Sequence, residues 1–370
     1  MGIRTILRVS TKYLWNLLGL ISLIFIQRNY GYEVVGVMAF GMAYVSLFLP
    51  AADLGFSSAH SKRLNEKQLD EGICNGTYAF TRMILNFVMI LIVILSLQIH
   101  SYLGYSFESR IVEIVIYLYI VRYFFYNINK TFHGIFNAKL EVAKKVIPNT
   151  ISRLIQMSLK CTIAIFFYQE FGVEYLVGAE IFSAFILTLL FIYFIRGTPF
   201  SLPDWEYFKY YSKFAIPVIF LGIIGSLNHT FDKIILQYFI GSESVGIYVI
   251  AERLALFFLV ISSSITKLLF PSFSNLHSNK DMDRISRLSN LSVRYISMTM
   301  IPLVIFTYIF SEEILTLLFG QEAKTSSPIL RVLLVSLYIL AISRPYTIQM
   351  TATGHVKTGL IVNAISLLIN

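Results

Sequence analysis

The chain has 370 residues, of which 56% are hydrophobic and only 14% are charged, and its formal net charge is +9. An ordinary soluble domain carries about a quarter charged residues, so this composition excludes that class and indicates a membrane protein. The two cysteines, Cys74 and Cys161, do not suggest a disulfide framework and say nothing about function.

Apolar runs along the chain approach the roughly 20 residues that a helix needs to cross about 30 Å of hydrocarbon. The eleven predicted spans are 13–28, 34–54, 76–99, 112–129, 149–169, 175–195, 214–239, 244–266, 291–310, 327–346 and 358–370. No small-residue cleavage site follows the first run, so we interpret it as an uncleaved helix. The last run stops inside "TGLIVNAISLLIN", so we expect the sequence to be a fragment. The predicted fold is an all-α, polytopic membrane protein.

Positive charges lie mainly in alternate loops, and Lys and Arg are retained on the cytoplasmic side of a membrane. One set of loops holds Arg4, Arg8, Lys12, Lys62, Arg63, Lys67, Lys130, Lys139, Lys144, Lys145, Arg196, Lys209, Lys213, Lys267, Lys280, Arg284, Arg287, Arg344 and Lys357. The opposite set holds only Arg28, Arg110 and Lys324. We therefore predict a cytoplasmic N-terminus and short external loops. The net charge reflects this asymmetry and the anionic lipid it faces, so it is weak support for a nucleic-acid partner.

An internal repeat links "QRNYGYEVVGV", from Gln27, with "QYFIGSESVGI", from Gln237. The matching pairs, each 210 residues apart (241 − 31 = 210), are Gln27 and Gln237, Gly31 and Gly241, Glu33 and Glu243, Val35 and Val245, and Gly36 and Gly246. Because the same spacing relates the fifth run to the eleventh, we expect two halves of six spans and about twelve spans in a full chain. An even number of spans gives both halves the same orientation, as in parallel-repeat transporters.

The predicted domains are an N-terminal six-helix bundle at 1–198, an interfacial linker at 199–213, and a C-terminal bundle at 214–370 that we expect to be incomplete. In the linker, prolines break regular structure and aromatic residues alternate with lysines. Such a pattern is typical of a surface segment at the cytoplasmic interface, and we assign it no catalytic role.

The start of the predicted second half, "KFAIPVIFLGIIGSLNHTFDKIILQYFIGSESVGIYVIAERLA", resembles Wzx-type polysaccharide flippases. The matching positions are Pro217, Asp232, Gly241, Val245, Gly246, Tyr248, Ala251, Arg253 and Leu254. In the first half, "GYEVVGVMAFGMAYVSLFLPAADLGFSSA" is similar to the family's second helix with its DLGF-like ending at Asp53 to Phe56, and "GIFNAKLEVAKKV" is similar to the segment entering its fifth helix. This polysaccharide transporter branch shares a superfamily with the lipid II flippase and the multidrug and toxin extrusion transporters. A projected total of twelve spans favours the oligosaccharide branch over the fourteen-helix lipid II flippases.

The resemblance implies a flippase in the bacterial cytoplasmic (inner) membrane. Its expected substrate is a polyprenyl-pyrophosphate-linked oligosaccharide, moved from the cytoplasmic to the outer leaflet for assembly of a surface polysaccharide such as O-antigen or capsule. The expected partners are this substrate, membrane lipid and no nucleic acid, and polysaccharide polymerase machinery is a further partner to consider. The resemblance implies no enzymatic activity and no cofactor.

Several charges fall deep within predicted spans, where each costs at least ~2.5 to 3.5 kcal/mol and needs a partner or a wet cavity. Arg253, for example, lies roughly 14 Å into its helix at 1.5 Å per residue. The candidates for substrate binding are Arg253, Arg122, Lys160 and Arg153. Guanidinium groups can hold a pyrophosphate through charge-assisted hydrogen bonds, so we expect a basic central cavity with alternating access.

Each deep charge also has a structural interpretation. The candidates for ion coupling or for salt bridges are Asp232, Lys233 and Glu252. A pair between Asp232 and Arg253 that locks the second bundle stays an open alternative to substrate binding, and Arg153 can extend to the cytoplasmic interface. Three further charges, Glu113, Glu180 and Arg331, lie nearer the outer ends, whereas Arg82 and Arg294 are expected to extend to the cytoplasmic interface.

Two other classes of function stay open. An extrusion-type multidrug or cation antiporter shares the architecture, but should have an acidic and aromatic lining. A membrane glycan polymerase or glycosyltransferase needs a sizeable external loop, and the histidines show no metal-ligand spacing. The chain contains no phosphate-binding loop for ATP hydrolysis.

Overall fold

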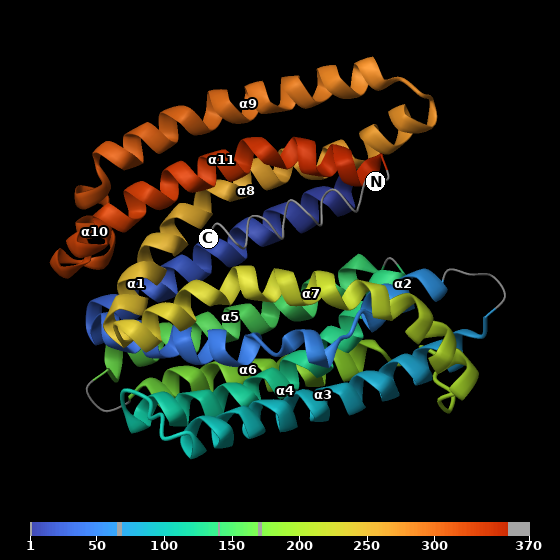
Figure 1. Ribbon diagram of the computed structural model, residues 1–370, viewed down its shortest axis with the longest axis horizontal. Helices are drawn as coiled ribbons and strands as arrows, with labels where there is room; N and C mark the ends of the chain where they lie inside the picture. Colours follow the sequence, from blue (N-terminus) through green and yellow to red (C-terminus); the bar gives the residue numbers. More distant parts are fainter. Residues whose placement is uncertain (1, 65–68, 140, 169–171, 354–370) are drawn as a thin grey trace. The chain divides into compact units, whose positions relative to one another are not determined.

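The computed structural model describes residues 2–64, 69–139, 141–168 and 172–353, and these residues form helices and no strand (Figure 1). In chain order the elements are α1 (Gly2–Ser46), η1 (Leu49–Ala52), α2 (Phe56–Arg63), α3 (Glu71–Tyr102), α4 (Arg110–Ala138), α5 (Val142–Phe166), α6 (Val173–Phe194), α7 (Trp205–Phe239), α8 (Ser242–Ser278), α9 (Met282–Ile309), α10 (Ser311–Phe319), η2 (Gln321–Ser326) and α11 (Ser327–Ala352). The predicted span at 358–370 lies outside the described residues.

Five stretches of the described chain are by themselves long and apolar enough to cross a membrane: Glu71–Tyr102, Arg110–Ala138, Val173–Phe194, Met282–Ile309 and Gln321–Ala352. A bent pair, Leu14–Ser46 with Leu49–Arg63, makes a sixth if it is counted as one span. The prediction of an all-α, polytopic membrane protein is confirmed.

The glycines that anchor the predicted repeat occupy similar backbone turns. Gly31 interrupts α1 with a φ of 78°, and Gly241 separates α7 from α8 with a φ of 118°. L-residues with a side chain rarely adopt this region, which explains why glycine stands at both positions. The 210-residue spacing therefore relates two places where one long helix ends and the next begins.

The second predicted span, 34–54, is wrong in its ending. The helix stops at Ser46, passes through η1 and resumes as α2, and the axis bends by 48° at this break. Pro50 has no backbone N–H and cannot continue an α-helix. The Ser226 hydroxyl of α7 donates hydrogen bonds to the freed carbonyls of Ser46 (2.9 Å) and Leu47 (3.4 Å). As a result, Asp53 lies in the middle of a broken span instead of at its end.

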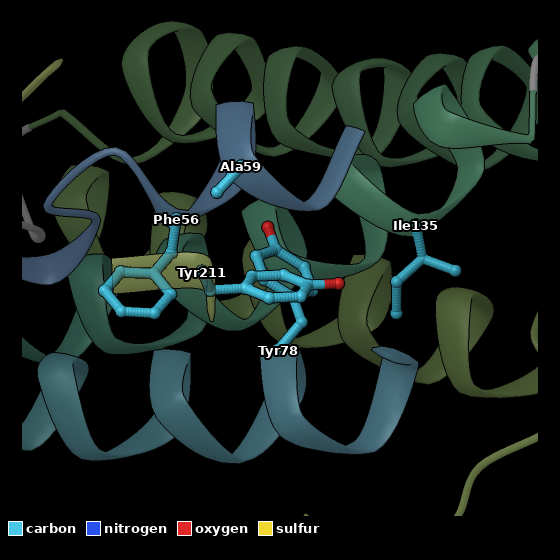
Figure 2. Close-up of a cluster of buried hydrophobic side chains, with 5 residues drawn as sticks. All are labelled: Phe56, Ala59, Tyr78, Ile135 and Tyr211. Atoms are coloured by element: carbon cyan, nitrogen blue, oxygen red, sulfur yellow. The ribbon is translucent and has the colours of Figure 1, made fainter. Parts of the chain in front are cut away.

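The helices of the first part pack along their lengths: α4 against α3 and α6, and α5 against α1 and α6 (Figure 1). At one end of this bundle, Phe56, Ala59, Tyr78, Ile135 and Tyr211 form a buried cluster in which the rings of Tyr78 and Tyr211 lie between Phe56 and Ile135 (Figure 2). This cluster joins α2, α3 and α4 to the first turns of α7.

His60 reinforces the same cluster. Its ring is fully buried, stacks on Tyr78 at 4.1 Å between centroids, and shares a hydrogen bond of 3.0 Å with the Tyr211 hydroxyl. Because an aromatic stack and a buried hydrogen bond act together here, the N-terminal end of α7 is firmly attached to α2 and α3.

The segment predicted as a surface linker also binds to α3. The Ser201 N–H donates to the Gly72 carbonyl (2.9 Å), and the Asn75 side chain donates to the Pro199 carbonyl (3.0 Å). A Cβ on Gly76 would overlap the Ser201 carbonyl oxygen, so glycine is required for this approach. By its contacts the chain divides into two compact units, 1–245 and from 246 onwards, and the predicted domain boundary at 199–213 stays a prediction.

Within the second unit, α9 packs against α11, and α10 and η2 pack against the start of α11. Its core contains Leu259, Ile296, Met300 and Ala341, contributed by α8, α9 and α11. Toward the end of α8, Leu269 and Phe273 pack on Ile285 of α9.

Candidate functional site

Three of the predicted basic residues meet around one carboxylate, Glu180, and we call Arg122, Arg153, Lys160 and Glu180 the Glu180 cluster. The Arg122 Nε lies 2.6 Å from Glu180 Oε2, and the Lys160 ammonium pairs with Glu180 Oε1. Glu180 is 6% exposed and Lys160 is 7% exposed. Helices α4, α5 and α6 each contribute to the cluster, so it ties together the helices that pack most closely in the first unit.

Arg153 completes the cluster from one face of α5. It lies seven residues before Lys160, about two helical turns, and is close enough to interact electrostatically with Lys160 and Glu180. Its guanidinium donates a hydrogen bond of 3.1 Å to Gln156 and is exposed. Three cations against one carboxylate leave the cluster with an excess of positive charge, and this excess could bind a second anion.

Aromatic rings surround the guanidinium of Arg122. Its Cζ lies 5.1 Å from the ring centroid of Tyr123 and 5.7 Å from that of Tyr119. Such cation–π contacts hold a guanidinium in place without neutralising its charge. Arg122 therefore combines a fixed orientation with one ion pair and a side chain that is still 16% exposed.

Glu180 is the centre of this site, although the sequence pattern predicts it only as a charge near an outer helix end. It lies seven residues after the start of α6 at Val173. The missing information was the rotation of α6, which turns the carboxylate toward α4 and α5. The available signal was the occurrence of an isolated acid in an otherwise apolar span near two isolated bases.

A second ionic cluster, the Asp53 cluster, surrounds the break in the second span and consists of Asp53, Ser57, Arg82 and Lys130. Asp53 lies 3.2 Å from the charged nitrogens of both Arg82 and Lys130, and it accepts hydrogen bonds from the Ser57 N–H (3.0 Å) and hydroxyl (2.8 Å). Arg82 also donates to the Ala52 carbonyl. The carboxylate thus accepts hydrogen bonds from the first turn of α2 and pairs with one base from each of two neighbouring helices.

Two predictions about these bases are wrong. Arg82 does not extend to the cytoplasmic interface, because its side chain is 1% exposed and pairs with Asp53. Lys130 does not lie in a cytoplasmic loop, because α4 continues to Ala138 and brings Lys130 to the same carboxylate. The first error follows from ending the second span at 54, which hid an internal acid, and the second from ending the fourth span at 129.

The Asp53 cluster faces a hollow of about 420 Å³ in the first unit. Its lining combines hydroxyl groups, small apolar residues, Asp53 and Lys130, namely Ser46, Leu49, Pro50, Asp53, Leu54, Gly55, Ser58, Lys130, Gly222, Gly225, Ser226 and Thr230. Lys130 is 37% exposed, so its ammonium remains accessible beside the ion pair.

The remaining predicted residues lie on α7 and α8. Asp232 is half-buried and Lys233 is 7% exposed, while Glu252 is half-buried and Arg253 is exposed. Asp232, Lys233 and Glu252 all have polar or electrostatic interactions. The pairing of Asp232 with Arg253 stays a prediction. Across the described ranges, no group of three or more His, Cys, Asp and Glu side chains could hold a metal ion.

Comparisons with known proteins place this geometry in context. A family model described as "Polysaccharide biosynthesis protein" matches residues 33–328. The chain is 23% identical over 338 residues to the probable flippase AglR of Haloferax volcanii, covering 89% of this chain and 66% of AglR. It is 24% identical over 375 residues to a Shigella flexneri protein described as an O-antigen transporter, covering 95% of this chain and 87% of that protein.

Solved structures share the fold at low sequence identity. An inward-facing multidrug resistance MATE family transporter matches with a TM-score of 0.74 and 18% identity, covering 99% of this chain and 88% of that one. The lipid II flippase MurJ in an inward closed conformation matches with a TM-score of 0.78 and 15% identity, covering 97% of this chain and 78% of that one. At these identities the likeness establishes the fold alone.

Proposed function

The chain belongs to the family of polysaccharide biosynthesis proteins, and on that premise we propose that it is a flippase for a lipid-linked glycan. The expected cargo is a polyprenyl-pyrophosphate-linked oligosaccharide that moves from the cytoplasmic to the outer leaflet of the bacterial inner membrane. Two relatives, described as a probable flippase and as an O-antigen transporter, support this class of cargo. The resemblance noted from the sequence is confirmed at the level of the family.

The observation that carries the proposal is the charge balance of the Glu180 cluster. Its three cations share a single carboxylate, and two of its three helices, α4 and α6, are long and apolar enough to span a membrane. A charge in the hydrocarbon region is costly, and such charges usually mark a substrate pathway. The cluster is suited to a ligand with two or more negative charges, and a pyrophosphate is such a ligand.

The mechanism that we infer is alternating access. The pyrophosphate and the first sugars enter from the cytoplasmic side, the basic side chains replace the water around the phosphates, and the polyprenyl tail stays in lipid. Arg122 and Arg153 can each present two N–H groups to phosphate oxygens, whereas Lys160 acts as a point charge. Arg253, exposed on α8, is the candidate contributed by the second half.

A multidrug or cation antiporter is the competing function, because a MATE family transporter shares the fold. A cationic substrate would need an acidic group with spare negative charge. Asp53, which lines the hollow, is already paired with Arg82 and Lys130. Glu180, which lies outside the hollow's lining, is paired with Arg122 and Lys160. These pairings favour an anionic cargo. The roles of Asp232, Lys233 and Glu252 in ion coupling stay predictions.

The proposal is tested by the sidedness of lipid-linked oligosaccharide in cells that lack the gene. A sugar-specific, membrane-impermeant probe is applied to right-side-out and inverted membranes. We expect the intermediate to accumulate on the cytoplasmic leaflet, and the full-length gene to clear it. Unchanged sidedness, with export of a cationic dye lost instead, would overturn the flippase in favour of the antiporter.

A further inference from the structure

The loop between α3 and α4 carries a carboxylate that binds the turn between α7 and α8. Glu108 Oε2 accepts hydrogen bonds from the Ser242 N–H (2.8 Å), the Ser242 hydroxyl (2.7 Å) and the Gln237 side-chain amide (2.8 Å). Ser242 is the first residue of α8, so Glu108 occupies the position of a helix cap contributed from elsewhere in the chain. Its negative charge also matches the positive end of the α8 dipole.

The turn is shaped to receive this carboxylate. Gly241 has a φ of 118°, and a Cβ at this position would lie 3.0 Å from Glu108 Oε1. Ser242 is 1% exposed and Gln237 is 7% exposed, so both donors are directed into the contact and away from solvent. Gln237 and Gly241 match Gln27 and Gly31 in the 210-residue repeat. At the α7–α8 turn, both residues take part in the contact with Glu108.

Phe107 provides a second anchor next to Glu108. Its ring stacks on His100 at 4.4 Å and packs near Phe40 (6.1 Å) and Tyr44 (6.0 Å) of α1. Tyr238 of α7 also contacts Phe40 (6.1 Å) and His100 (5.7 Å). The aromatic cluster therefore connects the C-terminal end of α7 to α1 and to the α3–α4 loop. The carboxylate of Glu108 lies next to this cluster and binds the first residue of α8.

The two ends of α7 are held in different ways. At the N-terminal end, Tyr211 is fully buried in the aromatic cluster of Figure 2. At the C-terminal end, Tyr238 and Phe239 are exposed although Tyr238 contacts Phe40 and His100, and the carboxylate of Glu108 provides a polar attachment. Because the Glu108 side chain itself is exposed, its carboxylate can exchange the buried donors for water when the helices move, so the C-terminal end is the one that can detach.

We propose that Glu108 is a latch that holds the α7–α8 turn against the α3–α4 loop and must release before the cargo can leave on this side. By the predicted orientation this side is external. The identity of the cargo rests on the proposed function, whereas the latch itself rests on the contacts of Glu108. Release detaches the α7–α8 turn, with Gln237 and Ser242, from the α3–α4 loop.

The latch stays charged under ordinary conditions. Hydrogen bonds donated by the Ser242 hydroxyl and N–H and by Gln237 hold the pKa of Glu108 below its usual value of 4.5. The carboxylate is therefore ionised at neutral pH, and movement of the helices, not protonation, breaks the contact.

Labelling of a cysteine on α7 tests the latch in the full-length protein in intact cells. The native Cys74 and Cys161 are first replaced, and Thr230, which is 5% exposed and lines the hollow, is changed to cysteine. The rate of modification by an external, membrane-impermeant maleimide reports opening of this side. We expect Glu108→Gln to raise that rate by about fivefold, because charge-assisted hydrogen bonds become neutral ones.

Two further variants keep the test decisive. Ser242→Ala removes one donor but keeps the backbone N–H, and should raise the labelling rate by a smaller factor even where Glu108→Gln inserts poorly. Glu113→Gln, at an exposed acid near the same end of α4, should leave the rate unchanged. Equal labelling in the Glu108, Ser242 and Glu113 variants would overturn the latch. Since labelling does not depend on cargo, that failure is distinct from a failure of the flippase proposal.

Discussion

At the residue scale, Glu180 is the carboxylate that balances part of the positive charge of the first bundle. It pairs with Arg122 and Lys160 at once, and Arg153 is within electrostatic reach. The sequence predicts from hydropathy that these bases lie deep in the membrane, which stays a prediction. It could not predict their shared partner, because a contact between helices depends on how each helix rotates about its axis.

Glu180→Gln should lower the free energy of unfolding by about 3–5 kcal/mol, because two buried cations lose their counter-ion. The measurement is thermal unfolding of the purified full-length protein in detergent. Glu113→Gln, which neutralises an exposed acid, should change stability by no more than about 0.5 kcal/mol. Equal melting temperatures for the two variants would contradict a structural role for the cluster.

Lys160→Met separates folding from transport. This change leaves the pair of Arg122 and Glu180 intact and replaces a buried ammonium with an apolar chain, so the protein should accumulate normally. Clearance of the lipid-linked oligosaccharide from the cytoplasmic leaflet should fall about tenfold, which corresponds to 1.4 kcal/mol of lost binding to the cargo. Normal clearance at normal protein level would remove Lys160 from the substrate site.

At the element scale, the break in the second span determines which charged side chains meet inside the bundle. The sequence shows Pro50, yet the apolar run continues past it, and hydropathy alone therefore extends the span to 54, just before Gly55. The structure resolves this conflict by a 48° bend, which leaves Asp53 available to Arg82 and Lys130. A proline inside an apolar run could have indicated the break, but not which acid it would place in the bundle.

Asp53→Asn tests how much the ion pairs of Asp53 stabilise the broken second span. Arg82, whose side chain is 1% exposed, would lose its counter-ion, and we expect a loss of stability of about 3–5 kcal/mol. Asp53→Glu retains the charge and should recover part of that loss. Unfolding midpoints of the purified variants give the comparison, and a fully stable asparagine variant would show that Arg82 is satisfied without the carboxylate.

The cap on α8 predicts a defined pH dependence. The pKa of Glu108 is lowered in the folded protein, so its stabilising contribution is present above the ordinary carboxyl value of 4.5 and is lost as the pH falls through the lower folded value. The difference in stability between the wild type and Glu108→Gln should therefore be constant near neutral pH and should disappear in acid. A difference that already declines between neutrality and pH 5, about half a unit above that value, would contradict the assigned hydrogen bonds.

At the scale of the whole molecule, hydropathy was sufficient to predict an all-α, polytopic membrane protein, whereas the two related halves inferred from the 210-residue repeat stay a prediction. These features are readable because spanning a bilayer imposes a length and an apolar composition on every helix. The positions of Gly31 and Gly241 show that the repeat is also a repeat of backbone turns. The attachment of 199–211 to α3 was not predictable, since it depends on backbone contacts such as that between Ser201 and Gly72.

The most direct measurement uses the purified full-length protein in vesicles that contain a polyprenyl-pyrophosphate-linked oligosaccharide. Appearance of the sugar at the outer surface is followed with an impermeant, sugar-specific probe. We predict protein-dependent exposure of the sugar that is competed by polyprenyl pyrophosphate without sugar and is reduced by Arg253→Ala in correctly inserted protein. Exposure no faster than in protein-free vesicles, or exposure that polyprenyl pyrophosphate does not compete, would contradict a basic site that carries a lipid-linked pyrophosphate.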